Sequence, residues 1–450
     1  MKKTIIEIGR GVKCIYPPKV LRQKIEKDLC FENPAYKKAI EQGRSPGNMS
    51  PYIILFDQDK DTFWLPRGYV FFLVKFIKQI NHPYILVDET VTFDPLDFKF
   101  HGKLRDYQKT AESKILNYPV GVLEASTGSG KTTMALSVIT KRQQPTLILV
   151  HTKELLYQWK DRITEFLKED CGIIGDGKFQ IKPITVGTIQ TVHKKLPQIT
   201  DHFGQLIIDE CHRYGSHTTA YAIQDFPAKY FLGLTATPFR SDGLTKIIFA
   251  GIGPKIHKVN KTGLFESGAV LQPKIKKVET NFRYTFTNDY SAMVSTLTKD
   301  ENRNLLICSK IAENLKLFNE TILVISDRKN HAKIIRETLQ NSYKINSSLL
   351  LGSTNKKTRE QSVEDIRAGK SKVMIATTSL IMEGFDLSDL TSLFITTPIK
   401  FSGRLIQACG RILRPRKGKK PLIYDFRDDW VPVLKYSGYA RDRVYRSEWK

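Results

Sequence analysis

The chain has 450 residues with 41% hydrophobic content, which is enough for the cores of two or three domains. Lysine and arginine outnumber aspartate and glutamate by 71 to 46, and the formal charge of +25 indicates either a polyanionic partner or a basic surface that keeps the protein soluble. The six cysteines show no paired spacing, which argues against a zinc site and a disulfide framework. Charges at Lys2 and Lys3 argue against a secretory signal, and the longest apolar run, 69–74, is too short for a membrane span. A cytoplasmic location is therefore expected.

Residues 1–100 are rich in aromatic side chains and show no regular alternation of strands and helices. The sequence Leu65-Pro66-Arg67-Gly68 is a turn signal, and a helix is possible over 69–79. We therefore predict a small accessory domain. Arg67, Lys75 and Lys78 are its first candidates for contact with a nucleic acid, with stabilisation of its own turn as the alternative role of Arg67.

Two later runs of short apolar strands alternating with amphipathic helices each predict an α/β unit with a parallel sheet. The predicted strands lie at 120–123, 146–150, 184–186, 206–208 and 231–234, and then at 322–325, 348–351, 373–376, 393–396 and 422–424. The clearest predicted helices lie at 155–167, 331–339, 359–366 and 403–413. Glycines and prolines interrupt 246–300. The predicted organisation is therefore an accessory domain, two α/β domains and a connector, at 1–100, 101–245, 301–450 and 246–300.

A phosphate-binding loop is predicted at residues 125–132, Ala-Ser-Thr-Gly-Ser-Gly-Lys-Thr, between a strand and a helix over 132–140. Its glycines permit a tight turn whose N–H groups face an anion at the start of the helix. In that geometry Lys131 reaches the β- and γ-phosphates of a nucleotide, and the Thr132 hydroxyl ligates Mg²⁺. The strict pattern begins with glycine where this chain has Ala125, and a plain glycine-rich turn is the alternative. The predicted nucleotide contacts here are Thr127, Gly128, Ser129, Gly130, Lys131, Thr132 and Thr133.

Two adjacent carboxylates, Asp209 and Glu210, follow the apolar run 205–208 directly. The end of a parallel strand is the place where ligand crevices form. We predict that Asp209 holds Mg²⁺, usually through water, and that Glu210 polarises the attacking water. A solvated surface loop is the alternative, which the phosphate loop makes much less favourable.

The motifs occur in the order found in superfamily 2 helicases, which the chain resembles over about residues 101–430. They are Leu104 to Gln108, the phosphate loop, Asp209 to His212, Thr235 to Pro238, Ala376 to Asp386 and Gln407 to Arg414. The Asp-Glu-Cys-His box and the Leu-Pro-Arg-Gly element look most like phage branch-migration helicases of the UvsW type, and they are similar to XPB-like helicases and restriction-enzyme motor subunits. The resemblance implies two tandem RecA-like α/β domains with ATP between them.

The resemblance also implies roles for residues outside the phosphate loop. Arg105 and Gln108 would bind the nucleotide, with Gln108 forming paired hydrogen bonds to adenine. Arg411 and Arg414, three apart on a predicted helix, would act as arginine fingers, and Gln407 would orient the attacking water. A basic helix face is the alternative for this trio.

Coupling residues are implied as well. Gly384 and Asp386 would link the ATP site to the nucleic-acid strand, and Thr235 and Thr237 would couple hydrolysis to domain motion. His212 would connect the hydrolytic carboxylate to Thr235, with a satisfied core histidine as the alternative.

Nucleic-acid contacts are implied at strand ends that offer small hydroxyl side chains or exposed N–H groups, which suit phosphates. By family position they are His151, Thr152, Lys153, Gly187, Thr188, Gly352, Ser353, Thr354, Thr377 and Thr378. A helix cap or a turn is the alternative for each one singly.

The implied function is an ATP-dependent, Mg²⁺-dependent DNA helicase or translocase that remodels forks or Holliday junctions, with residues 1–100 helping to recognise the branch point. Three alternatives remain: a duplex-DNA translocase subunit of a restriction or repair complex, an RNA helicase, and a non-catalytic nucleic-acid-binding protein.

Overall fold

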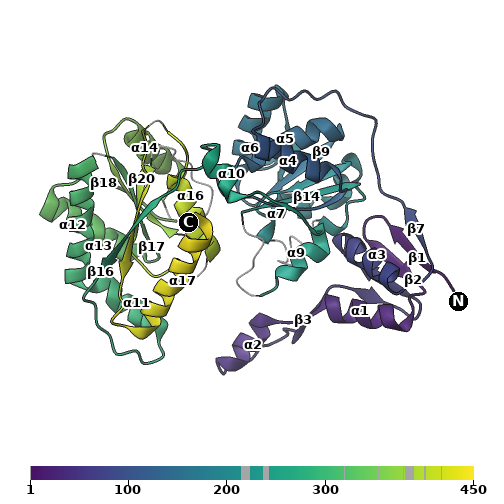
Figure 1. The fold of residues 1–450 in the computed structure, drawn as a ribbon, viewed down its shortest axis with the longest axis horizontal. Helices are drawn as coiled ribbons and strands as arrows, with labels where there is room; N and C mark the ends of the chain where they lie inside the picture. The colour runs from purple at the N-terminus through teal and green to yellow at the C-terminus, as the bar shows by residue number, and fades with distance from the viewer. Residues whose placement is uncertain are drawn as a thin grey trace. The chain divides into compact units, whose positions relative to one another are not determined.

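The computed structural model describes residues 2–213, 223–236, 243–318, 320–352, 354–378, 380, 390–399, 402–416 and 418–449. The chain divides into two compact units, Met1–Ala125 with Gly130–Val259, and Ser126–Ser129 with Asn260–Lys450 (Figure 1). No helix within the described ranges combines the length and hydrophobicity that crossing a membrane requires.

The first unit begins with a five-stranded sheet in the order β5-β6-β2-β1-β7. These strands are β1 (Thr4–Ile8), β2 (Val12–Ile15), β5 (Asp57–Gln58), β6 (Thr62–Leu65) and β7 (Tyr84–Asp88). Helices α1 (Lys19–Leu29) and α3 (Val70–Gln79) cover one face, because their buried side chains share a core with alternate residues of β1, β2 and β6. A short ladder of β3 (Cys30–Glu32) with β4 (Tyr52–Ile54) and helix α2 (Pro34–Glu41) complete this region. It is the predicted accessory domain, and α3 confirms its predicted helix.

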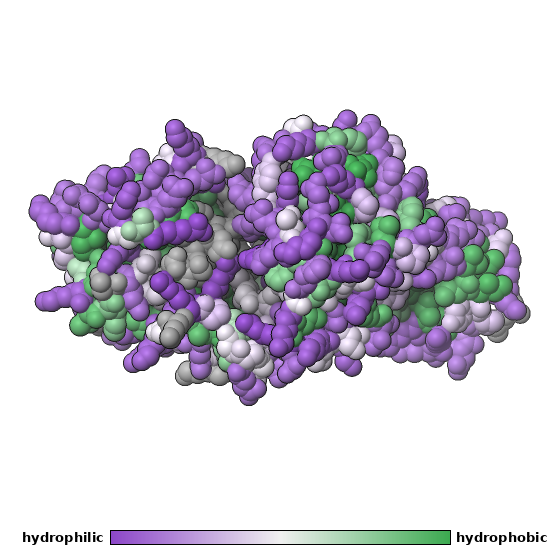
Figure 2. Space-filling model, turned by 90° about the horizontal axis from the view of Figure 1, so that it is seen from above, coloured by the Kyte–Doolittle hydropathy of each residue, from purple (hydrophilic) through white to green (hydrophobic). Residues whose placement is uncertain are grey.

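Strand β7 is an edge strand of that sheet. Its residues Ile85, Leu86 and Val87 are 45%, 48% and 37% exposed. Figure 2 shows hydrophobic side chains gathered at the right-hand end of the molecule, where Figure 1 places the N-terminal sheet, on an otherwise largely hydrophilic surface.

The larger sheet of the first unit has the order β11-β10-β12-β9-β13-β14-β8-β15 and is parallel except for the β10–β11 pair. Continuous apolar runs form its central strands, as expected for a sheet covered on both faces. The strands are β8 (Val120–Glu124), β9 (Thr146–Val150), β10 (Gly172–Gly175), β11 (Lys178–Phe179), β12 (Ile184–Thr188), β13 (Gln205–Ile208), β14 (Tyr230–Thr235) and β15 (Lys255–Lys258). Its helices are α4 (Asp106–Leu116), α5 (Lys131–Arg142), α6 (Lys153–Leu167), α7 (Ile189–His193) and α9 (Thr245–Ile252). All five predicted strands are confirmed.

The second unit is built on a parallel six-stranded sheet in the order β16-β21-β20-β17-β19-β18. Its strands are β16 (Lys274–Glu279), β17 (Thr321–Ser326), β18 (Ser347–Leu350), β19 (Val373–Thr377), β20 (Leu390–Ile395) and β21 (Leu422–Arg427). Its helices are α10 (Lys261–Glu266), α11 (Tyr290–Lys299), α12 (Glu301–Phe318), α13 (Lys329–Tyr343), α14 (Lys356–Arg367), α16 (Ser402–Ile412) and α17 (Pro432–Trp449). The predicted fold class, two parallel-sheet α/β domains with a small N-terminal sheet domain, is confirmed.

The segment 246–300, predicted as a connector, contributes strands to both larger sheets. Strand β15 pairs with β8, and β16 pairs with β21. Gly253 ends α9 with a φ of 126°, which favours glycine.

The turn 65–68 fastens the N-terminal sheet to α9. A Cβ atom on Gly68 would lie 2.2 Å from the Gly253 nitrogen, so the two backbones touch at this point. Arg67 is 2% exposed, its Nη1 donates to the carbonyl of Gly9, and its guanidinium lies 5.5 Å from the ring centre of Phe231. Burial lowers the pKa of Arg67 to about 10, which leaves it charged at neutral pH. Arg67 therefore does not face solvent, and the structure supports its alternative role, stabilisation of its own turn. Lys75 and Lys78 are exposed as predicted.

Candidate active site

The carboxyl ends of β8, β13 and β14 bring three predicted motifs to one edge of the first unit's large sheet. Thr235 pairs with Glu124 in β8, and Ile208 pairs with Gly233 in β14. Ala125, Asp209 and Thr235 therefore lie at neighbouring strand ends, where parallel sheets bind ligands.

The phosphate loop leads from β8 into α5, as predicted. Lys131 is the first residue of the helix, and its Nζ donates to the carbonyl of Ala125 at 3.0 Å, across the loop. Ala125 is 1% exposed and its N–H donates to the carbonyl of Thr235 at 2.9 Å, so the small side chain is accommodated where the strict pattern has glycine. Gly130 has a φ of 79°, a conformation that favours glycine.

Gln108 lies against this loop. It is 4% exposed, its Oε1 accepts the N–H of Arg105 at 2.9 Å, and it thereby caps α4. A Cβ atom on Gly130 would lie 2.4 Å from Gln108 Nε2, so the amide end of Gln108 packs directly on this glycine. The structure therefore places Gln108 at the loop, while its contact with adenine stays a prediction. Arg105 is exposed at the start of α4.

Asp209 and Glu210 follow β13 directly. Asp209 is 8% exposed, and its Oδ1 accepts the N–H of Glu210 at 2.9 Å. Glu210 has a φ of 49°, an uncommon conformation for a residue with a side chain, of the kind that clusters at functional sites. Sequence reasoning missed one residue here: Trp159 of α6 donates its indole N–H to Asp209 Oδ2 at 2.9 Å. A buried tryptophan needs an acceptor for its N–H, but nothing in the sequence indicates which one.

The pKa values of Asp209 and Glu210 are shifted in opposite directions. Burial, followed by the charge of Glu210, raises the pKa of Asp209, which the Trp159 hydrogen bond and Lys131 partly oppose. Burial also acts to raise the pKa of Glu210, but the contact with His212 at 3.2 Å and the charge of Lys131 outweigh it, and the pKa of Glu210 is lowered. Glu210 is therefore the carboxylate held ionised, as a group that polarises water must be.

A Mg²⁺ ion fits this arrangement by the chemistry of its donors. Carboxylate and hydroxyl oxygens are the ligands that Mg²⁺ prefers, and the Asp209 carboxylate and the Thr132 hydroxyl supply them. A divalent cation would also compensate the buried negative charge that raises the pKa of Asp209.

His212 lies between Glu210 and β14. Its Nδ1 is 3.2 Å from Glu210 Oε2 and 3.2 Å from Thr235 Oγ1, and Thr235 is fully buried. This is the link that the motif order implies. Thr237 lies outside the described residues.

In the second unit, α16 ends at Ile412, so Arg414 follows the helix and does not continue it. The prediction that Arg411 and Arg414 share one helix face is therefore wrong. Pro415 explains the difference, since a proline disfavours helical conformation in the residue before it. The side chains of Arg411 and Gln407 on α16 lie outside the described part of the structure, as do Gly384 and Asp386.

The predicted nucleic-acid residues differ in what they expose. Lys153 has a 64% exposed side chain that pairs with Asp176 at 2.5 Å, and Thr152 caps α6 by accepting the N–H of Leu155. Burial, followed by the charge of Arg213, lowers the pKa of His151 to about 3, so it is neutral and offers a phosphate no charge.

The remaining candidates are mostly buried. Gly187 lies inside the β12 ladder and is buried, and a Cβ atom there would lie 2.6 Å from the side chain of Val192. Its contact with a phosphate stays a prediction. Thr188 is 7% exposed, and its hydroxyl bonds that of Thr191. In the second unit, Thr377 and Thr378 are buried, whereas Gly352 is exposed. The Thr354 hydroxyl accepts the N–H of Leu351, and Ser353 lies outside the described residues.

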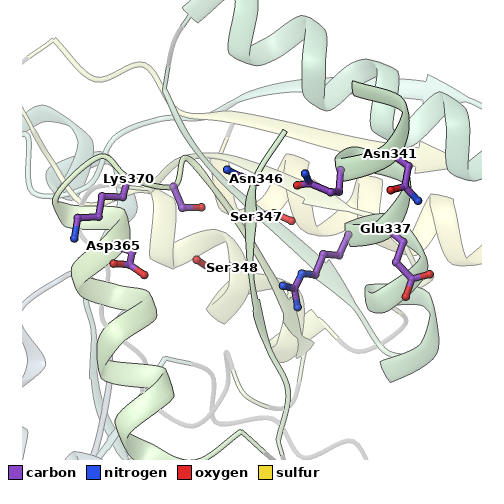
Figure 3. Close-up of a pocket in the computed structure, with 10 residues that line it drawn as sticks. Glu337, Asn341, Asn346, Ser347, Ser348, Asp365 and Lys370 are labelled. Atoms are coloured by element: carbon purple, nitrogen blue, oxygen red, sulfur yellow. The ribbon is translucent and has the colours of Figure 1, made fainter. Parts of the chain in front are cut away.

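A polar pocket of 540 Å³ lies elsewhere in the second unit, beside the edge strand β18 and between α13 and the end of α14 (Figure 3). Two basic side chains, Arg336 and Lys370, and two acidic ones, Glu337 and Asp365, line it. This balanced charge does not suit a triphosphate, and none of the predicted site residues lines the pocket.

Comparison with known proteins gives the family. A model named "Type III restriction enzyme, res subunit" matches residues 101–240, and a "Helicase conserved C-terminal domain" model matches residues 303–416. The DNA 3'-5' translocase XPB2 of Sulfurisphaera tokodaii is 30% identical over 380 residues, which cover 76% of this chain and 85% of the relative. D10 of Escherichia phage T5, which bears the name of a helicase, is 28% identical over 382 residues, which cover 82% and 80%. Among solved structures, the helicase domain of Hef from Pyrococcus furiosus has a TM-score of 0.52 at 16% identity and covers 75% of this chain and 98% of that one, a likeness of fold alone.

Proposed function

The chain belongs to the superfamily 2 helicases and is an ATP-dependent enzyme, and we propose that it uses Mg²⁺·ATP to remodel branched DNA such as forks and four-way junctions. The observation that supports the motor chemistry is the assembly of Lys131, Asp209, Glu210 and His212 at one sheet edge. The formal charge of +25 supports a nucleic-acid partner of either kind, and DNA is favoured because the S. tokodaii relative is named a DNA translocase.

In this proposal each side chain has a physical task. Lys131 leaves the carbonyl of Ala125 and places its charge on the β- and γ-phosphates, while Thr132 and Asp209 hold Mg²⁺. Glu210, kept ionised by His212 and Lys131, accepts a hydrogen bond from the attacking water. Bound Mg²⁺ supplies neutralisation of the charge that develops on the phosphates.

In this proposal His212 connects the site of hydrolysis to strand β14. Loss of the γ-phosphate changes the hydrogen bonding of Glu210, and His212 is within 3.2 Å of both Glu210 and Thr235. We infer that this contact transmits the change to the end of β14. Arg414, Arg411 and Gln407 keep in this proposal the roles in hydrolysis that the family resemblance implies.

The test is ATPase stimulation measured in parallel with single-stranded DNA, duplex, fork, four-way junction and RNA. Stronger stimulation by forks or junctions than by duplex supports the proposal. Equal stimulation by every duplex-containing DNA, with displacement of a third strand, would favour the translocase-subunit alternative. Stimulation by RNA alone would move the assignment to an RNA helicase. Glu210→Gln is the matched control, since it should bind each substrate without turnover.

A further inference from the structure

The carboxylate of Asp209 is held at both oxygens. Oδ1 accepts the backbone N–H of Glu210, and Oδ2 accepts the indole N–H of Trp159, each at 2.9 Å. The first bond comes from the adjacent residue and moves with the strand end. The second comes from α6, fifty residues earlier in the chain, and therefore fixes the carboxylate to a separate element.

Packing alone does not account for Trp159. The other buried side chains on this face of α6 are the aliphatic Leu156, Ile163 and Leu167. An indole brings an N–H donor that must be satisfied inside the protein, and here its acceptor is a buried, negatively charged group. Trp159 itself is 2% exposed, so solvent does not compete for this bond.

We propose that Trp159 is a positioning residue for the Mg²⁺-binding carboxylate, an inference that rests on the proposed ATP site. Two N–H donors fix the plane of the Asp209 carboxylate and occupy one acceptor position on each oxygen. A carboxylate has about four such positions, so the remaining ones stay open to the water shell of Mg²⁺ in a defined direction. Partners of this kind typically change metal affinity by about 10- to 100-fold when they are removed.

The variant Trp159→Phe removes the N–H and keeps a large aromatic side chain. We expect the Mg²⁺ concentration for half-maximal ATPase to rise about tenfold, the lower end of that range, because Asp209 reaches the ion through water. Most of the maximal rate should return at saturating Mg²⁺. Nucleotide binding in EDTA should equal that of the wild type. Trp430→Phe is the matched control, since Trp430 is 60% exposed in the second unit.

A spectroscopic measurement tests the same contact in the unaltered protein. The chain has four tryptophans, and 5-fluorotryptophan labelling gives each a ¹⁹F signal that the Phe variants assign. Adding Mg²⁺ at constant ADP should shift the Trp159 signal and leave that of Trp430 in place. This readout does not depend on whether Trp159→Phe folds.

The outcomes separate this inference from the proposed function. The inference is overturned if the wild type hydrolyses ATP but the Mg²⁺ dependence of Trp159→Phe is unchanged. It is also overturned if the ¹⁹F signal of Trp159 does not shift when Mg²⁺ is added. Nucleotide affinity that falls equally with and without Mg²⁺ would assign Trp159 a packing role only. A wild type without ATP turnover would instead defeat the proposed function.

Discussion

Gly68→Ala tests how the N-terminal sheet is attached to the first motor domain. A Cβ atom at this position would lie 2.2 Å from the nitrogen of Gly253, 2.7 Å from the carbonyl carbon of Ile252 and 2.7 Å from the oxygen of Phe249. Ordinary contacts of this kind lie at 3.4–4 Å, so the turn must move by more than 1 Å. All three obstacles are backbone atoms, which cannot rotate away. Overpacking costs about 1–3 kcal/mol, and we expect the upper end.

Urea unfolding of the full chain, together with limited proteolysis, measures this effect. Gly9→Ala is the matched control in the same domain, because the nearest atom to its Cβ is 3.7 Å away. Neither glycine has a positive φ, so the comparison isolates the steric effect. An unfolding curve for Gly68→Ala that coincides with those of the wild type and Gly9→Ala would refute the attachment.

The remaining predictions concern chemistry and pH. Lys131→Ala should abolish ATP turnover, and Glu210→Gln should bind ATP without hydrolysing it; normal turnover by Glu210→Gln in a phosphate-release assay would contradict its role. Arg414→Ala should lower turnover about a thousandfold while leaving ATP affinity, measured by equilibrium binding, nearly unchanged. Burial, followed by the charge of Arg303, lowers the pKa of His331 to about 3. Only the unfolded chain therefore takes up a proton below pH 6.5, and this histidine should reduce the free energy of unfolding by about 1.4 kcal/mol per pH unit down to about pH 3. His331→Gln should flatten that slope in urea titrations at pH 7.0 and 5.5, and an equal slope would contradict the assignment.

Sequence periodicity predicted the parallel strands well because a strand buried on both faces is a continuous apolar run. The strand at 146–150 has its predicted bounds, and seven of the other nine contain the predicted range and extend it by one to three residues. The strand predicted at 348–351 is shifted to Ser347–Leu350, and the one predicted at 393–396 lies at Leu390–Ile395. The phosphate loop and Asp209 were predictable for a related reason, since each motif directly follows such a strand.

The apolar pattern of the sequence did not predict elements that are stabilised by buried polar contacts. Helix α17 buries Ser437, Gly438 and Arg441, and Arg441 bonds Asp425 at 2.9 Å. In sequence these residues appear solvent-exposed, so no apolar repeat marks the helix. Trp159 was missed because its role depends on an acceptor that only the folded sheet brings near.

The attachment of the N-terminal sheet changes how its role must be tested. Deleting residues 1–100 would remove Arg67 and Gly68, which pack on Phe231 and on the end of α9, so the deletion would damage the motor domain as well as any DNA contact. Ala250 of α9 belongs to the core of the N-terminal sheet and would be uncovered. Neutralising the exposed Lys75 and Lys78 avoids this damage, because neither side chain is buried. A contribution to branch recognition should then appear as weaker fork and junction stimulation with unchanged stimulation by single-stranded DNA, and equal loss on all substrates would indicate a general charge effect.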